Sequence, residues 1–186
     1  PRLEETSLNT LVREAGKRVE PEAVASGVTV DYLLDPALPG CALDPALVRE
    51  GLVNLVRSAV YAASHSQVKR VRVATRTAGR VLQVVCQDTG AAIPEAEAGR
   101  IFELAGATTF ETLGFCAAAT VARSHGGRAS VRSQDGIGNA FLLEFPMADA
   151  NPATDAPRSL DGLKVLVVDD ESFLLECLAD ALESWG

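Results

Sequence analysis

The sequence lacks a cluster of lysine or arginine, a C-x-x-C pair and a long apolar run. Its 17 Lys and Arg residues are outnumbered by 25 Asp and Glu residues, which gives a formal net charge of −8. Because binding of a phosphate backbone requires concentrated positive charge, we expect no nucleic acid among the partners. No apolar stretch reaches the ~20 residues that a membrane span requires, and no signal peptide opens the chain. We therefore expect no membrane contact by this chain.

The four cysteines are also too scattered to form a recognisable framework, at positions 41, 86, 116 and 177. This spacing favours reduced, mostly buried thiols in a cytoplasmic protein over disulfides or a zinc site. A length of 186 residues accommodates one full domain and a remnant, or two very small domains. The chain starts abruptly and stops inside an apparent helix, so we expect it to be a piece of a longer protein.

Amphipathic and alternating segments follow one another in an order typical of an α+β fold. Pro21 is expected to kink or stop the first helix, and Asp44 is a suitable cap for the second. The expected helices cover 8–19, 45–65, 96–104 and 113–124, and the expected strands cover 28–34, 69–77, 80–88, 128–133 and 139–146. We predict a two-layer sandwich, in which helices cover one face of a mixed, mostly antiparallel sheet.

The character of the sequence changes after residue 147. Residues 148–162 are rich in Pro, Asp and Ala without periodicity, so they are predicted to be a linker. Residues 163–186 give an apolar strand, an acidic turn and an amphipathic helix, which is the first step of a parallel α/β domain. We expect one domain at 1–147, the linker, and a truncated α/β unit at 163–186.

The second expected helix carries a polar stripe on an otherwise apolar surface. Its members recur at steps of four, four, three and four, which places them along one line of a helix. They are Glu50, Asn54, Ser58, Tyr61 and His65. From the residues alone, a solvated helix edge explains this stripe as well as a functional site does.

Four blocks, in order and in spacing, resemble the ATP-binding catalytic domain of sensor histidine kinases, within the fold family that includes gyrase, the Hsp90 chaperones and MutL. "LDPALVREGLVNLVRSAV" is similar to the asparagine-box helix and "VVCQDTGAAIP" to the first glycine box. "RIFEL" resembles the phenylalanine box, and "TLGFCAAATVARSHGGRASVRSQDGIGNAFLLEFP" resembles the end of the second glycine box with the closing hairpin. The resemblance spans Leu8 to Pro146.

This resemblance implies a site for ATP and Mg²⁺. Asp88 would accept a hydrogen bond from the adenine amino group, and Gly90 would let the backbone approach the base. Asn54 and, at the place of the family's second asparagine, Ser58 would ligate Mg²⁺. The implied nucleotide-binding residues are Asn54, Ser58, Tyr61, Asp88, Gly90, Ala92, Ile93, Leu113 and Gly114.

Several positions depart from the family pattern around the metal, the phosphates and the lid. Ser58 replaces an asparagine, Tyr61 a basic residue and Ala92 a glycine. Glu111 puts an anion where the family's glycine-rich run would cradle phosphate, and the lid is short. Repulsion and a short lid would weaken the binding of a triphosphate.

The tail "VLVVDDE" resembles the first strand of a response-regulator receiver. Asp169 and Asp170 match the acidic pair that holds Mg²⁺ in that family, although an acidic helix cap explains them equally well. A kinase-like domain followed by a receiver is the order of a hybrid kinase. His65 and His125 are the only histidines, and neither has the context of a phosphoacceptor.

Two functional hypotheses remain open from the sequence. In the first, a bacterial hybrid sensor histidine kinase domain binds ATP–Mg²⁺ weakly and supplies the phosphoryl group for a histidine elsewhere. In the second, a pseudokinase whose ATP site has decayed docks phosphorelay partners. Expected partners are upstream dimerisation and phosphoacceptor helices, and a receiver of the same protein or a response regulator, in a full-length homodimer. The receiver-like tail disfavours an ATPase of the gyrase or chaperone type.

Overall fold

The structure is a computed structural model that describes residues 1–102 and 110–147, the side chains of Phe110 and Glu111 excepted. The predicted linker at 148–162 and the predicted α/β unit at 163–186 lie outside the described residues. The same holds for Asp169 and Asp170, the candidate metal ligands of that unit.

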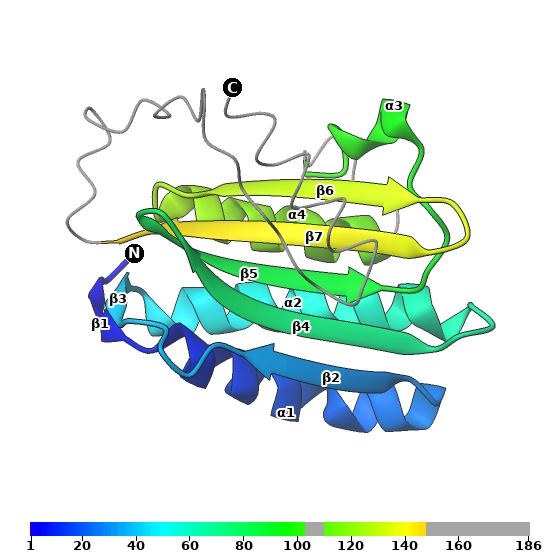
Figure 1. Cartoon of the computed structure of the whole chain (residues 1–186), viewed down its shortest axis with the longest axis horizontal. Coiled ribbons are helices and arrows are strands. Elements are labelled where there is room, and N and C mark those ends of the chain that lie inside the picture. Colours follow the sequence, from blue (N-terminus) through cyan, green and yellow to red (C-terminus); the bar gives the residue numbers. More distant parts are fainter. Residues whose placement is uncertain (103–109, 148–186) are drawn as a thin grey trace, which may run out of the picture. The chain divides into compact units, whose positions relative to one another are not determined.

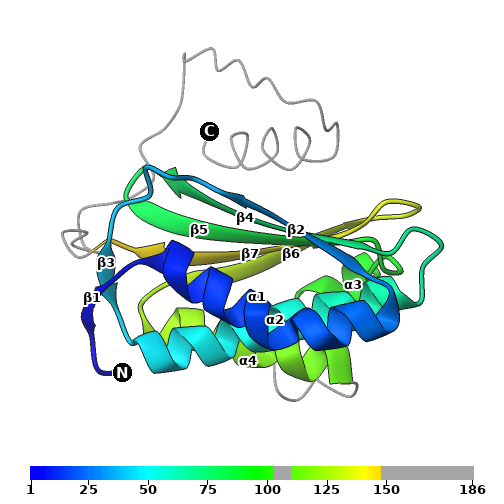
Figure 2. The same ribbon diagram turned by 90° about the horizontal axis from the view of Figure 1, so that it is seen from below.

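The described chain forms two layers, a sheet and a layer of helices (Figures 1 and 2). The helices are α1 (Leu8–Ser26), α2 (Pro45–Ser64), α3 (Glu95–Ala98) and α4 (Phe110–Ser124). The main strands are β2 (Thr29–Leu34), β4 (Arg70–Ala78), β5 (Val81–Asp88), β6 (Arg128–Gln134) and β7 (Gly138–Pro146). Two short strands, β1 (Glu4–Thr6) and β3 (Cys41–Leu43), pair antiparallel beside this sheet.

The strand order of the main sheet is β2-β4-β5-β7-β6. β2 runs parallel to β4, and the other neighbours are antiparallel. Helices α1, α2 and α4 cover one face of this sheet (Figure 2). The predicted α+β sandwich with a mixed, mostly antiparallel sheet is thus confirmed, while β1 and β3 were not predicted.

Several helix boundaries differ from the sequence expectation, among them the start of α4 at Phe110 rather than at residue 113. Pro21 does not stop α1, which continues to Ser26. Because proline has no N–H, the carbonyl of Lys17, four residues before Pro21, has no partner within the helix. Both residues are exposed, so solvent can supply the missing hydrogen bond. The short helix α3 ends at Ala98, earlier than predicted, because Gly99 follows it.

The hydrophobic core lies between the sheet and the helices. Inward-facing side chains of the central strands, such as Val73, Val84 and Phe141, are fully buried. Helix α2 contacts α1 on one side, α4 on the other and the sheet beneath, so most of its circumference is buried. This middle position explains why α2 is apolar nearly all round. None of the described helices is both long and apolar enough to span a bilayer.

Ion pairs join the exposed sides of α1 and α2. They are Arg18–Glu50, Arg49–Glu14 and Arg57–Glu22. Because such exposed pairs each contribute ~0–1 kcal/mol, they favour one register of the two helices more than they stabilise the fold. The first residue of the polar stripe, Glu50, therefore serves helix packing.

The start of α2 is tied to the end of α4 by Asp44 and His125. The Asp44 carboxylate accepts hydrogen bonds from the backbone N–H groups of Arg2 (2.6 Å) and Leu47 (3.1 Å), and these hold its pKa below the ordinary value. The Asp44 N–H donates to Nε2 of His125 (3.0 Å), while Nδ1 of His125 lies 2.8 Å from the Val121 carbonyl oxygen. His125 is thus a neutral structural residue at this junction.

A closed ring of hydrogen bonds joins α1 to the sheet. The Thr75 hydroxyl donates to Oδ1 of Asn9 (2.6 Å), and Nδ2 of Asn9 donates to the Asp35 carbonyl (2.7 Å). The Asp35 N–H completes the ring by donating to the Thr75 hydroxyl (3.1 Å). Asn9 and Thr75 are buried, so each bond compensates a group that has lost its water.

We predict that Asn9→Ala lowers the free energy of unfolding by about 1–3 kcal/mol, because it leaves a buried hydroxyl and a carbonyl without their partner. Urea denaturation followed by circular dichroism measures this loss. The matched control is Thr10→Ala at the neighbouring exposed position, which is expected to stay within about 0.5 kcal/mol of the parent chain. Equal stability of the two variants would contradict a stabilising role for the ring.

Candidate functional site

A cavity of about 880 Å³ opens at one end of the domain. Its walls come from the C-terminal end of α2, the loops 66–68 and 89–94, helix α3 with Ile101, the first turns of α4 and the β6–β7 turn. Figure 1 shows α3 and the β6–β7 turn at the same end of the sheet. Segments distant in sequence therefore meet around one space.

Asp88, the last residue of β5, is not itself a lining residue of this cavity but is hydrogen-bonded to two residues that are, Gly90 and Asn139. Its side chain points to the helix layer and is 4% exposed. Oδ1 of Asp88 accepts two hydrogen bonds, from the Gly90 N–H (2.8 Å) and from Nδ2 of Asn139 (2.9 Å). Burial, and to a smaller extent the charge of Asp88, raise the pKa of the Cys86 thiol, so Cys86 stays neutral. The two hydrogen bonds to Oδ1 hold the Asp88 carboxylate in one position.

Asn139 is a site residue that sequence reasoning missed. It is 2% exposed, and its Oδ1 accepts from the Ile93 N–H (3.2 Å) and the Ser133 hydroxyl (2.7 Å). Its Nδ2 donates to the Ala91 carbonyl (3.1 Å) as well as to Asp88. A single side chain thus ties the cavity loop to β5, β6 and β7. The signal was present, because Asn139 is the one polar residue at the inward positions of "NAFLLEFP".

Gly90 is required by close packing against α2. An added Cβ would lie 2.8 Å from Cβ of Ala62 and 2.8 Å from Oδ1 of Asp88. Both distances are shorter than real Cβ contacts, so any other residue would push the loop away from the helix. The glycine therefore brings the loop after β5 and the end of α2 into one wall.

The implied nucleotide-binding residues divide into two groups. Gly90, Ala92 and Ile93 line the cavity. Tyr61 is 44% exposed and packs its ring at 4.7 Å, between centroids, from that of His65, which does line the cavity. The first glycine box and the end of the polar stripe therefore lie at the same site.

The second group lies where α4 crosses α2. Ser58 is 1% exposed, and a Cβ on Gly114 would lie 2.0 Å from its hydroxyl oxygen and 2.8 Å from the Asn54 carbonyl oxygen. Asn54 is half-buried and Leu113 is 48% exposed. None of these four is among the described residues that line the cavity.

Residues 43–149 match the family of histidine kinase-, DNA gyrase B-, and HSP90-like ATPases. This match covers more than half of the chain. The chain belongs to this ATPase family.

Curated relatives are sensor kinases. The chain is 31% identical over 150 residues to sensor protein FixL of Bradyrhizobium diazoefficiens, covering 78% of this chain and 29% of FixL. It is 26% identical over 147 residues to sensor histidine kinase ZraS of Escherichia coli, covering 78% of this chain and 31% of ZraS. The chain thus spans less than a third of the length of these two proteins.

Solved structures agree on the fold. The catalytic domain of histidine kinase ThkA superposes with a TM-score of 0.70 at 21% identity, covering 79% of this chain and 97% of that domain. The ATPase family thus accounts for the sandwich.

The family binds ATP, usually with Mg²⁺, and of the two candidate Mg²⁺ ligands on α2 the packing covers Ser58 and leaves Asn54 half-buried. Mg²⁺ needs several oxygen ligands in an octahedron, and the Ser58 hydroxyl is covered by Gly114. Within the described ranges, no group of three or more His, Cys, Asp or Glu side chains could hold a metal. In this arrangement, α4 would have to move before Ser58 could reach a ligand.

Gly138 gives a direct test of how the site is held. Its φ is +131°, and a Cβ there would lie 1.9 Å from the Asp88 carbonyl oxygen. We predict that Gly138→Ala lowers the free energy of unfolding by about 3–5 kcal/mol, as backbone strain and a steric clash add up. It should also shift the NMR signal of the Gly90 amide, which donates to Asp88.

The control for this variant is Gly136→Ala in the same turn. Gly136 also has a positive φ, +77°, but a Cβ there meets nothing within 4 Å. We expect a loss of about 1–2 kcal/mol from the backbone alone and no change at Gly90. Equal losses in the two variants would show that Gly138 does not hold the Asp88 backbone in place.

Proposed function

We propose that this chain is the nucleotide-binding domain of a hybrid sensor histidine kinase in two-component signalling, and that its cavity receives an adenine base. The observation that carries this proposal is the fixed carboxylate of Asp88, held directly behind the cavity wall by the lining residues Gly90 and Asn139. An exocyclic amino group is a donor, and a buried, immobile carboxylate is the acceptor that reads it best.

The proposed partners rest on the family and on the contacts of the two histidines in this chain. ThkA has been crystallised in complex with the response regulator TrrA. We propose a comparable partnership here, with a response regulator or with a receiver that begins at 163–186, in a homodimer formed by upstream helices. His125 is engaged at the junction of α2 and α4, and Nδ1 of His65 lies 2.9 Å from the Tyr61 carbonyl oxygen. The phosphoacceptor histidine is therefore expected on another segment.

The role of the domain in phosphoryl transfer would be positioning. ATP, when bound, supplies the γ-phosphoryl group, and catalysis in such transfers is mostly orientation and charge neutralisation. This chain's residues would hold the base at Asp88 and pack it against Ile93. With Ser58 covered, only Asn54 of the two candidate Mg²⁺ ligands on α2 remains partly exposed, which supports weak ATP binding.

A second candidate function is a pseudokinase that docks phosphorelay partners. The observation that favours it is the same closed packing of Gly114 on Ser58, together with Tyr61 in place of a basic residue. In that case the domain acts through a surface that docks partners, and the cavity no longer binds ATP.

We predict that ATP binds the 186-residue chain with Kd of tens of micromolar or weaker, and that Asp88→Asn weakens binding at least tenfold. The asparagine oxygen still accepts from Gly90 and Asn139, which preserves the fold. The NH₂ group of the asparagine, however, would face the adenine amino group, and two donors cannot form a hydrogen bond with each other. Isothermal titration calorimetry with ATP and MgCl₂ measures both values.

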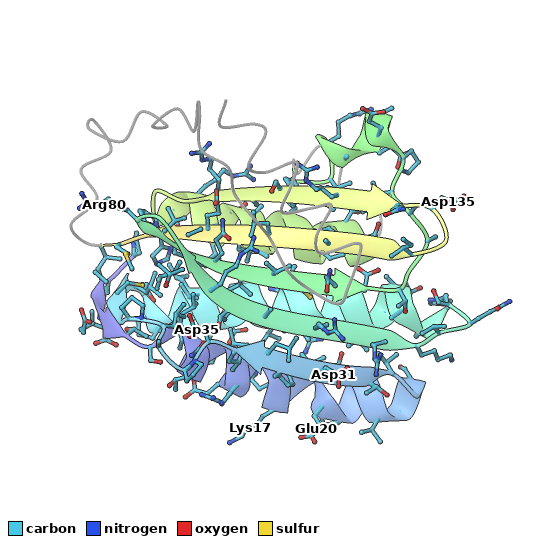
Figure 3. All side chains as sticks on the ribbon, viewed as in Figure 1. Lys17, Glu20, Asp31, Asp35, Arg80 and Asp135 are labelled. Atoms are coloured by element: carbon cyan, nitrogen blue, oxygen red, sulfur yellow. The ribbon has the colours of Figure 1, made fainter. Side chains whose placement is uncertain are left out.

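The matched control is Asp35→Asn, which removes a carboxylate just after β2, toward the opposite end of the domain from Asp135 (Figure 3), and can keep its hydrogen bond from the Ala37 N–H. It should leave binding unchanged. No heat at millimolar ATP, and no change in the Gly90 amide signal, would contradict the nucleotide site and leave the docking function. Equal binding by the parent chain and Asp88→Asn would contradict the assignment of Asp88.

A further inference from the structure

We propose that the cavity selects the uncharged adenine nucleoside and gains no affinity from the β- and γ-phosphates. Adenosine would then bind at least as tightly as ATP. This inference rests on the proposed function, since it assumes an adenine site at Asp88. It concerns the phosphate end of the ligand, whose contribution to affinity depends on the charges of the cavity.

The charged groups that line the cavity are acidic. Glu97 on α3 and Asp135 in the β6–β7 turn both belong to the lining, and no Lys or Arg does so among the described residues. Figure 3 shows Asp135 at the tip of the turn, at the end of the molecule where Figure 1 labels α3. A triphosphate placed in this cavity would meet two carboxylates and no fixed cation.

Two basic residues near the site bind other groups of the protein. Arg70 pairs with Asp31 at 3.1 Å on the sheet, and Nη2 of Arg123 donates to the Phe102 carbonyl (2.7 Å). The sequence from 101 to 122 contains no Lys or Arg at all, so this stretch supplies no cation in any conformation. Arg100, beside the lining residue Ile101, is exposed and lies outside the lining, so the described lining itself supplies no lysine or arginine to neutralise a triphosphate.

The start of α4 also offers little to a phosphate. A phosphate approaches a helix N-terminus through a glycine-rich turn that exposes backbone N–H groups. Here Gly114 is pressed against Ser58, and the residues that α4 gives to the cavity are Thr112 and Phe115. Side chains rather than a backbone cradle face the space.

The remaining lining suits an uncharged heterocycle. Apolar side chains form much of the wall, and a fixed carboxylate lies directly behind it, on Gly90 and Asn139; a mostly apolar wall with a few placed polar groups is the usual composition of a small-molecule pocket. The apolar members are Ala62, Val68, Ile93, Ile101, Phe115 and Ile137. Base and ribose would find contacts here, while added phosphates would find only repulsion.

The first experiment is a titration of the 186-residue chain with adenosine, AMP and ATP, the last with and without MgCl₂, at 50 and 300 mM NaCl. We expect adenosine to bind at least as tightly as ATP, and ATP affinity to rise with salt, because salt screens repulsion. At a cationic phosphate site, ATP affinity would fall with salt. ATP–Mg²⁺ at least tenfold tighter than adenosine, or weakened by salt, would overturn the inference.

The second experiment removes the charges. Glu97→Gln with Asp135→Asn should raise ATP affinity about three- to tenfold and leave adenosine affinity unchanged, because only the phosphates meet these carboxylates. Glu95→Gln is the matched control, since Glu95 lies on the same short helix but outside the lining. It should change neither affinity. No gain for ATP in the double variant would also overturn the inference.

The two proposals fail in different ways. If neither adenosine nor ATP binds, or if Asp88→Asn binds adenosine as well as the parent chain does, the adenine site itself is wrong. If adenosine binding depends on Asp88 but ATP binds far more tightly, the adenine site holds and only the nucleoside preference is wrong.

Discussion

The hydrogen bond between Asn139 and the Asp88 carboxylate is the constraint on which the rest of the site depends. The two residues are opposite partners in the antiparallel pairing of β5 with β7, so the sheet register itself brings them together. Asn139 then fixes the cavity loop at Ala91 and Ile93, while Gly138 lets the two strands approach closely behind it. A shift of β7 by one residue would turn Asn139 to the other face and release the loop.

Helix α2 shows how one element serves several tasks. Because it lies between α1 and α4 and above the sheet, it must be apolar on three sides, which leaves a narrow line for polar residues. That line does not act as one site. Glu50 pairs with Arg18 of α1, Ser58 is enclosed by Gly114 of α4, and His65 reaches the cavity. The neighbours of each residue, rather than the line, decide what it does.

The two ends of a nucleotide place separate demands on this ATPase fold. The base requires a fixed acceptor and an apolar wall, and both follow from sheet register and core packing. The phosphates require cations, a metal or exposed backbone N–H groups, which depend on a few surface residues that the fold does not need. In the proposed site, Asp88 and Gly90 belong to the first set, and Tyr61 stands where the family resemblance implies a basic residue of the second set. A domain can therefore retain its base site while its phosphate site changes.

Periodicity and motifs were sufficient to predict the sandwich and the cap at Asp44, because these follow from local patterns and from a spacing typical of the family. They did not predict β1 and β3, which are short and exist only by pairing across the chain. Asn139 escaped notice, since its meaning comes from Asp88, 51 residues away in sequence. Likewise, sequence spacing placed Ser58 beside the phosphates, whereas the packing of α4 on α2 covers it. Local order determined which elements form, and only tertiary packing decided which polar groups meet a ligand and which are enclosed.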